Sequence, residues 1–381
     1  MKKIIYMDHA ATTQLCPEAK AAMEPYLDRE YGNASSPYSL GTEAREAIEK
    51  ARNTIAGIID AYPEEIYFTS GGSESDNWAI KGFAGEKKYI GGHIITSKIE
   101  HHAVLNSCAY MEGLGYDVTY LDVDDQGIVD LKQLKDSIGK YTTLITVMTG
   151  NNEIGTIEPI TEIGNIAREK EILFHTDAVQ AIGQIPMQVH KMPVDALSAS
   201  SHKFHGPKGT GFLYVRKGIE VPSFIHGGSQ EKGKRAGTEN VAGIVGMAEA
   251  LRVAHSHMSQ NYRRVLRMRD TFIKRVMAEI PEVRLNGHKR SRLPGNVNMS
   301  IAGVEATALL VLLEEDGILA SAGSACTTGQ TRISHVIEAI GVPEDYATGT
   351  IRFTLGSENT MEEVNRAVEV LKQDVKLLRQ I

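Results

Sequence analysis

The stretch Ser200-Ser201-His202-Lys203-Phe204-His205-Gly206-Pro207-Lys208-Gly209 directly follows the apolar, strand-like run Val194-Asp195-Ala196-Leu197-Ser198. It places Lys203 between two histidines and beside two hydroxyls, an unusual position for a surface charge. An amine there can form a Schiff base with a carbonyl cofactor whose phosphate the hydroxyls would bind. A solvated lysine in a Gly/Pro loop is the alternative, because most lysines are exposed.

Strand and helix patterns alternate on both sides of Lys203. Strands are expected at 65–69, 93–96, 117–121, 143–148, 172–175 and 196–199, and 211–215 is expected to turn back as a further strand. An amphipathic helix is expected over 43–59, and another helix from about Asp76. This order predicts an α/β fold with a mostly parallel, seven-stranded type of sheet between helices. Such sheets bind ligands beyond the carboxyl ends of their strands.

The chain has 381 residues, too many for one ordinary core, so two domains are expected. Residues 239–278 predict two long helices with a weak break at His255-Ser256-His257, where we place the boundary. The large cofactor-binding domain would span 15–257. The smaller α+β domain would comprise 258–381 and the N-terminal segment 1–14. Its expected strands lie near 296–301 and 352–355, and its expected helices over 304–316 and 361–380.

Composition indicates a globular enzyme. Hydrophobic residues make up 42% and charged residues 23% of the chain, and the net charge of −7 comes without a basic face for nucleic acid. No apolar run reaches the roughly 18 residues of a membrane span, and residues 1–8 look like a strand and not like a signal peptide. Three cysteines without a CxxC pair argue against a disulfide scaffold or structural zinc, so we expect a cytoplasmic protein.

Two strand ends carry residues suited to a phosphate-bearing cofactor. Ser70-Gly71-Gly72-Ser73 joins a strand to a helix, where backbone N–H groups and the helix terminus favour an anion. A plain glycine-rich turn capped by Ser73 fits equally well. Asp177 ends an apolar strand, a position suited to pairing with a pyridinium nitrogen. A helix N-cap is the alternative for Asp177.

Three further residues have reactive or recognition chemistry. His101 can stack on an aromatic ring and relay protons, with a structural histidine as the alternative. Cys326 is surrounded by eight small or hydroxyl residues, which favours a reachable, reactive thiol, whereas Cys108 is expected to be packed in a helix. Arg352, inside an apolar strand, suits a substrate carboxylate, and an intramolecular salt bridge is its alternative.

Six motifs occur in one order along the chain: Met7-Asp8-His9-Ala10-Ala11-Thr12-Thr13, Thr69-Ser70-Gly71-Gly72-Ser73-Glu74-Ser75, Asn151-Asn152-Glu153-Ile154-Gly155, Ser201-His202-Lys203-Phe204-His205-Gly206-Pro207-Lys208-Gly209, Arg235-Ala236-Gly237-Thr238-Glu239-Asn240 and Ser324-Ala325-Cys326-Thr327. Together they resemble the NifS/IscS-type cysteine desulfurases, pyridoxal-phosphate enzymes of the class V aminotransferase family with the type I fold. The resemblance runs from about Tyr6 to Gly356. The combination is specific, although each motif alone is ambiguous.

The resemblance implies that pyridoxal 5'-phosphate is the cofactor and assigns it a set of contacts. The phosphate would be held by Gly72, Ser73, Ser200 and His202, and Thr238 would reach it from the other subunit of a homodimer. The ring would be contacted by Asp177, Gln180 and Asn152, and His101 would stack on it and relay protons. Lys203 would bind the cofactor covalently. Arg352 and Asn152 would also hold the substrate L-cysteine. Cys326 would take its sulfur as a persulfide and leave L-alanine.

The sequence departs from the family in the segment 327–335, in 33–38, and in the absence of a scaffold-docking tail beyond Ile381. These departures leave the sulfur acceptor open between an Fe–S scaffold protein and a tRNA or cofactor thiolation enzyme. We expect residues 330–334, beside Cys326, to contact that acceptor.

Two other functions remain. A selenocysteine lyase or aminotransferase of the same fold is one, but a transaminase needs no thiol such as Cys326. A non-enzymatic relative is the other, and the joint presence of Lys203, Asp177, His101 and Cys326 argues against it.

Overall fold

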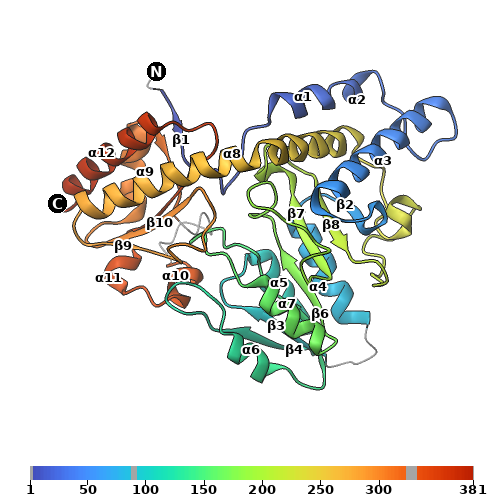
Figure 1. Cartoon of the computed structure of the whole chain (residues 1–381), viewed down its shortest axis with the longest axis horizontal. Coiled ribbons are helices and arrows are strands. Elements are labelled where there is room, and N and C mark those ends of the chain that lie inside the picture. Colours follow the sequence, from blue (N-terminus) through green and yellow to red (C-terminus); the bar gives the residue numbers. More distant parts are fainter. Residues whose placement is uncertain (1–2, 87–91, 323–332, 381) are drawn as a thin grey trace.

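The computed structural model describes residues 3–86, 92–322 and 333–380. Its larger part is built on a seven-stranded sheet with the order β2-β8-β7-β6-β5-β3-β4 (Figure 1). The strands are β2 (Ile66–Thr69), β3 (His93–Ser97), β4 (Asp117–Leu121), β5 (Thr142–Thr146), β6 (Leu173–Asp177), β7 (Ala196–Ser200) and β8 (Gly211–Val215). Neighbours pair in parallel except at β8, which runs antiparallel to both β7 and β2. The expected sheet and its reversed strand are confirmed.

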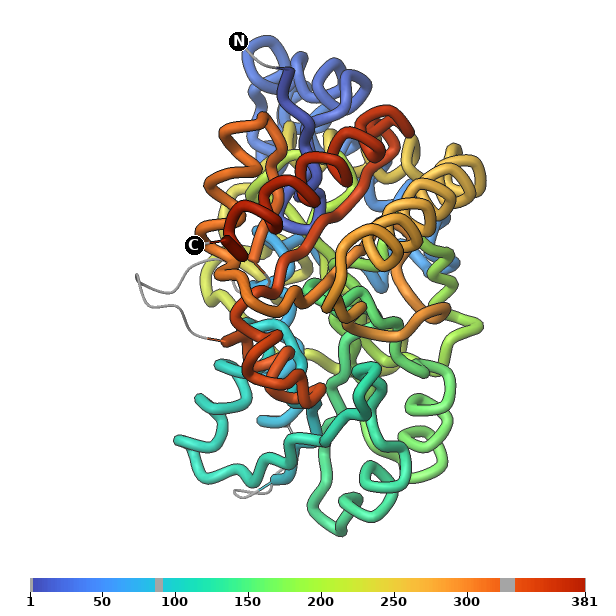
Figure 2. Tube along the Cα trace, turned by 90° about the vertical axis from the view of Figure 1, so that its left-hand side faces the viewer, coloured from blue at the N-terminus to red at the C-terminus, as the bar shows by residue number. Residues whose placement is uncertain are grey.

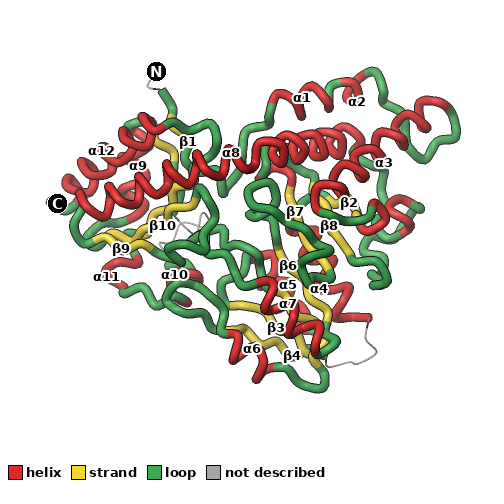
Figure 3. Tube along the Cα trace, viewed as in Figure 1, coloured by secondary structure: helices red, strands yellow, loops and turns green. Residues whose placement is uncertain are grey.

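Helices cover both faces of this sheet (Figure 3). On one face α4 (Gly72–Glu86) and α5 (His102–Gly113) form a core around the buried Trp78. On the other face α3 (Ser39–Ile59) and α7 (Ile160–Glu169) pack in a second core. The remaining helices of this part are α1 (Pro17–Met23), α2 (Pro25–Asp28) and α6 (Leu131–Ser137). Because both faces are covered, strands such as β5, β7 and β8 are buried throughout, which explains why none of the three contains a charged residue.

The smaller part contains a three-stranded antiparallel sheet, β12-β10-β9. Its elements are β9 (Val283–Leu285), β10 (Asn296–Ile301), α9 (Ala306–Glu315), α10 (His335–Ala339), α11 (Glu344–Ala347), β12 (Thr350–Thr354) and α12 (Met361–Leu378). The N-terminal strand β1 (Ile5–Tyr6) pairs in parallel with β11 (Ile318–Leu319), so the chain begins in the part where it also ends (Figure 2). From β1 the chain then crosses to the larger part.

One helix, α8 (Val241–Glu279), joins the two parts, and the break expected at His255-Ser256-His257 is wrong. These three residues are exposed because the helix here leaves one core and has not yet entered the next. A run of exposed polar residues in the middle of a helix looks like a loop in the sequence, although no proline or glycine interrupts the helix there. We propose that the domain division still crosses this region, since α8 residues up to Leu251 pack in one core and those from Val265 in another.

Other differences concern element ends. Helix α4 begins at Gly72 and not near Asp76, and β6 extends to Asp177. Both shifts place the chemistry-bearing residues at the ends of regular elements. None of the described helices is long and apolar enough to cross a membrane.

A buried ion pair fixes the loop before α8 to the larger part. Arg52 of α3 donates two hydrogen bonds to Glu231, at 2.9 and 2.8 Å, and its guanidinium also lies 4.5 Å from the ring centre of Phe68. Glu231 accepts a third hydrogen bond, from the Phe68 N–H at 2.9 Å. Its backbone is left-handed, with φ of 45°, so the pair holds a conformation that a glutamate seldom adopts.

Glu231→Gln should lower the free energy of unfolding by about 3 kcal/mol, because it removes the buried anion of Arg52 and leaves only the exposed Glu49, 3.1 Å from Nε, as a charged partner. Urea unfolding of the holoenzyme, followed by circular dichroism, measures the loss. Glu249→Gln, which breaks the partly exposed pair with Arg252, is the matched control and should cost less than about 1 kcal/mol. Equal losses in the two variants would contradict this role of Glu231.

Candidate active site

Lys203 lies in a short 3-10 turn, Ser201–Lys203, at the carboxyl end of β7. Its ammonium nitrogen Nζ donates to the carbonyl oxygens of Ala10 and, at 2.8 Å, Ala11. The N-terminal segment is held over the lysine by a second contact, since the Thr13 N–H donates to the His202 carbonyl at 2.9 Å. The solvated-loop alternative for Lys203 is therefore wrong.

The surroundings of Lys203 lower its pKa to about 8, mainly through burial and then through the positive Arg352. Asp8 and Asp177 act in the opposite direction. An amine with this pKa is partly deprotonated near neutral pH, which is what a nucleophilic lysine requires.

Asp177 is the last residue of β6 and is buried. Its Oδ1 accepts the Val179 N–H at 2.8 Å, and no described helix starts at this point, so the N-cap alternative is wrong. Burial raises the pKa of Asp177, while His101 and Lys203 favour its charged form. An added cation, such as a protonated ring nitrogen, would stabilise that carboxylate further.

Two more carboxyl groups are buried near Asp177. Asp76 of α4 has a pKa raised well above its usual value by burial and by the charge of Asp177. Burial also raises the pKa of Glu100 to about 8. His175 lies 3.8 Å from Asp76 but hydrogen-bonds the hydroxyls of Thr146 and Ser198, both at 2.9 Å, and burial lowers its pKa to about 3. Neutral neighbours leave Asp177 as the group that carries the negative charge.

His101 is the N-cap of α5, and its Nδ1 accepts the Ala103 N–H at 3.1 Å. This hydrogen bond places the proton of the neutral ring on Nε2. The ring stays accessible in the single chain, yet enough protein surrounds it to lower its pKa, mainly by desolvation. The structural role expected as the alternative is thus present, and it leaves Nε2 and the ring face available for a ligand.

The β2–α4 turn forms a cradle in which side chains would not fit. Gly71 has φ of +151°, and a Cβ on Gly72 would lie 2.5 Å from a methyl group of Val179. Ser200 is buried and faces this turn: its Oγ lies 3.5 Å from the place of a Cβ on Gly71. Ser73 follows in the first turn of α4 and is exposed. The N-terminus of a 15-residue helix with serine hydroxyls beside it fits a phosphate group.

His202, also expected at the phosphate, has its Nδ1 3.1 Å from the Thr12 hydroxyl. Burial and the neighbouring lysines lower its pKa to about 4, so it is a neutral hydrogen-bonding group at neutral pH. Gln180, expected at the ring oxygen, donates from Nε2 to the Ala10 carbonyl at 3.0 Å. The Ala10 carbonyl therefore binds both Gln180 and Lys203.

Arg352 and Asn152 lie together. The arginine donates from Nη1 to the Asn152 carbonyl at 2.9 Å and from Nη2 to Asp8 at 2.8 Å. The intramolecular salt bridge considered from the sequence is thus present. Among the described residues Nε of Arg352 has no hydrogen-bond partner, so the guanidinium keeps donors for a carboxylate. Asp8 and Ala10 were not predicted as site residues, although both lie in the first of the six motifs.

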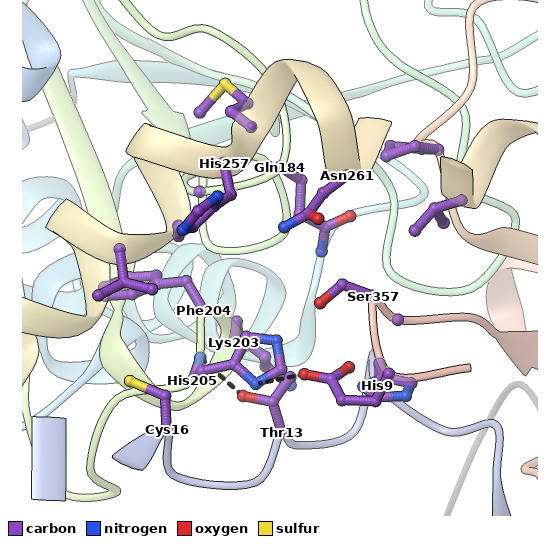
Figure 4. A pocket seen from close by; sticks show the side chains of 18 of the residues that line it. His9, Thr13, Cys16, Gln184, Lys203, Phe204, His205, His257, Asn261 and Ser357 are labelled. Carbon is purple, nitrogen blue, oxygen red and sulfur yellow. Dashed lines mark hydrogen bonds and ion pairs between the residues drawn. The ribbon is translucent and has the colours of Figure 1, made fainter. Parts of the chain in front are cut away.

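A cavity of about 310 Å³ opens beside Lys203, between the N-terminal segment, α8 and residues 355–358 (Figure 4). His9, Thr13, Cys16 and His205 line it. Thr238 lies elsewhere, in a separate pocket with Ser70 and Arg235.

The three cysteines differ in what the structure says of them. Cys108 is buried as expected, and burial raises its pKa to about 12. Cys326 lies outside the described residues. Of its described flanks, Ser321 exchanges two backbone hydrogen bonds with Arg352, and the Ser334 hydroxyl donates to Glu153 at 2.6 Å. The chain on both sides of Cys326 is therefore anchored at the group formed by Arg352, Asn152 and Glu153.

Comparisons with known proteins agree with this geometry. The sequence pattern of the class V aminotransferases matches residues 5–367. The cysteine desulfurase IscS of Dictyoglomus turgidum is 51% identical over 100% of this chain and 97% of its own length. A solved NifS-like protein superposes with a TM-score of 0.93 at 36% identity, covering 99% of this chain and 100% of the other. The solved complex of SspA with cysteine has a TM-score of 0.83 at 37% identity, covering 94% of this chain and 100% of the other.

The chain belongs to the class V aminotransferase family and, within it, to the cysteine desulfurases, which use pyridoxal phosphate. The residues present fit this cofactor: an amine of lowered pKa, a buried carboxylate and a glycine-serine cradle lie at neighbouring strand ends.

Lys203 should react with pyridoxal 5'-phosphate at lower pH than an ordinary lysine. The free amine is the reactive form, so the labelling rate should rise with pH and reach half its maximum near pH 8, not near 10.5. Borohydride trapping on cofactor-free protein, with mass spectrometry of the Lys203 peptide, measures this rate. Lys203→Arg should give no label there, and a midpoint near 10 would contradict the lowered pKa.

Proposed function

We propose that this chain is a cysteine desulfurase that converts L-cysteine to L-alanine and carries the sulfur as a persulfide on Cys326. The observation that carries the proposal is the convergence of Lys203, Asp177 and Arg352 at one edge of the sheet. Lys203 has a lowered pKa, and Arg352 keeps one buried N–H without a partner. An amine, a carboxylate and a guanidinium are the groups needed to bind a carbonyl cofactor and an amino-acid substrate.

Bound pyridoxal phosphate supplies an electron sink that makes the α-proton of an amino acid acidic. Gly72, Ser73, Ser200 and His202 would hold its phosphate, and Asp177 its ring nitrogen. The neutral His175 and the raised pKa of Asp76 support this charge assignment, because both favour keeping the negative charge on Asp177. His101, with its proton on Nε2, is placed to relay protons.

Substrate binding would use a guanidinium that is oriented in advance. Asp8 and the Asn152 carbonyl fix two nitrogens of Arg352 and leave Nε for the carboxylate of cysteine. Lys203 Nζ would take the α-proton, a task suited to an amine whose pKa is about 8.

Sulfur transfer needs a thiolate as the attacking group. The Cys326 Sγ forms a bond to the substrate sulfur, and the substrate Cβ–S bond breaks. The electron pair of the broken bond stays with the substrate, Cβ gains a proton, and Cα regains the proton that Lys203 took, so L-alanine leaves and a persulfide remains on Cys326. The anchoring of Ser321 to Arg352 supports a thiol that meets the substrate at this place.

Cys326→Ser should bind cysteine but form no alanine or persulfide, because a hydroxyl is not ionised at the pH at which a thiol is. Alanine release and mass spectrometry of the cysteine-containing peptides test this. Cys108 should stay unmodified, since burial raises its pKa to about 12. A persulfide on Cys108 or Cys16 in the native enzyme would show that the wrong thiol was chosen.

The enzyme would act as a homodimer with composite sites. Thr238 is exposed in the single chain, where a second subunit could meet it, and the resemblance to the cysteine desulfurases assigns it to the partner's phosphate. A two-fold interface repeats each contact, so both phosphate sites would gain a threonine.

Mixing Lys203→Ala with Thr238→Ala subunits should restore activity that neither homodimer has. In the mixed dimer one of the two sites combines a native Lys203 with a native Thr238. Desulfurase assays on co-expressed, doubly tagged dimers measure the gain. No gain over either parent would place Thr238 in its own subunit's site.

The persulfide would pass to an Fe–S scaffold protein or to a thiolation enzyme, and we place this exchange in the cytoplasm. The cysteine usage supports that location, since a reactive thiol is maintained most easily in a reducing compartment. The acceptor would meet residues 330–334, of which 330–332 lie outside the described residues.

A further inference from the structure

The segment 235–240, here called the Thr238 arm, is fixed at both ends. At its start Arg235 donates to Glu74 from Nε at 2.8 Å and from Nη2 at 3.2 Å. At its end the Asn240 side chain caps α8 by accepting the Gly243 N–H at 3.0 Å. Between them Gly237 has φ of +115°, a conformation that favours glycine. The position of Thr238 therefore depends on where Arg235 is held.

Glu74, which holds Arg235, also belongs to the phosphate cradle. It lies in the first turn of α4, directly after Ser73, and its Oε2 accepts the Ser70 N–H at 3.0 Å. One carboxylate thus bonds the turn that would bind a phosphate in its own subunit and the arm that would serve the partner subunit.

The Glu74–Arg235 pair is stronger than an ordinary surface ion pair. The side chains are only 12% and 23% exposed, and both nitrogens of the arginine fork take part. Burial alone would raise the pKa of Glu74, but Arg235 and Ser70 outweigh it and hold that pKa below its usual value. The carboxylate is charged, and a charged bidentate contact with little exposure resists rearrangement.

Two hydrogen bonds hold the middle of the arm, and neither comes from the cradle. The Ala236 N–H donates to the Ile225 carbonyl at 3.0 Å, and the Gly237 N–H donates to Gln230 at 3.2 Å. Both partners lie in the loop before α8. Glu74 is the member of this set that connects the arm to the phosphate turn.

We propose that Glu74 is a positioning residue that couples the two cofactor sites of the homodimer, by linking the phosphate cradle of one subunit to the arm with which that subunit serves its partner. This rests on the proposed role of Thr238 in the partner's site. Cofactor bound in one subunit orders the Ser70–Ser73 turn, Glu74 transmits this order to Arg235, and Thr238 is held ready for the other subunit. Thermodynamic linkage makes the effect reciprocal.

The test separates the two subunits of one dimer. One subunit carries Lys203→Ala, so that its own site cannot be labelled; the other is native. The dissociation constant of pyridoxal 5'-phosphate at the native subunit is measured by borohydride trapping on its Lys203. Adding Glu74→Gln to the Lys203→Ala subunit should weaken binding at the native subunit by about tenfold, the usual effect of losing a charged hydrogen bond. Gln keeps an acceptor for the Ser70 N–H, so the cradle of its own subunit is disturbed least.

Arg235→Gln in place of Glu74→Gln should give the same loss, and the two together should give no more, because both remove one contact. Glu249→Gln is the matched control and should leave the constant unchanged, since the Glu249 side chain bonds Arg252 within α8 and no residue of the arm.

An unchanged constant with Glu74→Gln would overturn the coupling and confine Glu74 to its own cradle. Thr238→Ala in the Lys203→Ala subunit tells this apart from failure of the composite site. If Thr238→Ala weakens the native site and Glu74→Gln does not, only the coupling is wrong. If neither has an effect, the shared site itself is wrong.

Discussion

The contact between the Lys203 ammonium and the carbonyls of Ala10 and Ala11 organises the site. It requires the N-terminal segment to leave β1 in the smaller part and lie across the sheet edge of the larger part. Along this path the Asp8 carboxylate accepts a hydrogen bond from Arg352 of β12, and the Thr13 N–H donates one to the His202 carbonyl. One short segment thus brings together Lys203, which would bind the cofactor, and Arg352, which would bind the substrate, although they belong to different parts of the chain. The two parts cannot separate without exposing both charges.

Burial determines which carboxyl groups near Lys203 are charged. Asp76, Glu100 and Asp177 are all removed from water, and each has a raised pKa. Several ionised carboxylates cannot persist side by side in such surroundings unless cations compensate them. Lys203 and His101 act on Asp177, whereas Asp76 and Glu100 have no such cation among their main influences. Of these three buried carboxyl groups, Asp177 is therefore the one that carries the negative charge, because Lys203 and His101 act on it.

The sequence predicted the features that depend on local pattern. The strand positions, the mostly parallel sheet, the reversed β8 and the places of Lys203, Asp177 and the Gly71–Gly72 turn follow from apolar periodicity and from the rule that ligands lie at carboxyl ends of parallel strands. The order of the strands across the sheet was not predicted. Nor did the sequence predict contacts made across the fold. The carbonyl of Ala10 has no sequence signature, and the Glu74–Arg235 pair joins residues that no local pattern connects. The false break in α8 has the same origin, because exposed polar residues look alike in a loop and in a helix that bridges two cores.

The groups of the candidate site differ in how rigidly the fold holds them. The groups that would bind the cofactor lie at strand and helix ends, where backbone hydrogen bonds fix them before any ligand arrives. Arg352, beside which cysteine would bind, is fixed as well, because it lies inside β12 and two of its nitrogens already bond Asp8 and the Asn152 carbonyl. The contact of Ser334 with Glu153 is made by side chains alone, and such a contact rearranges at lower cost than a strand does. A reaction that keeps its cofactor through every turnover but must admit cysteine and release alanine needs both kinds of contact.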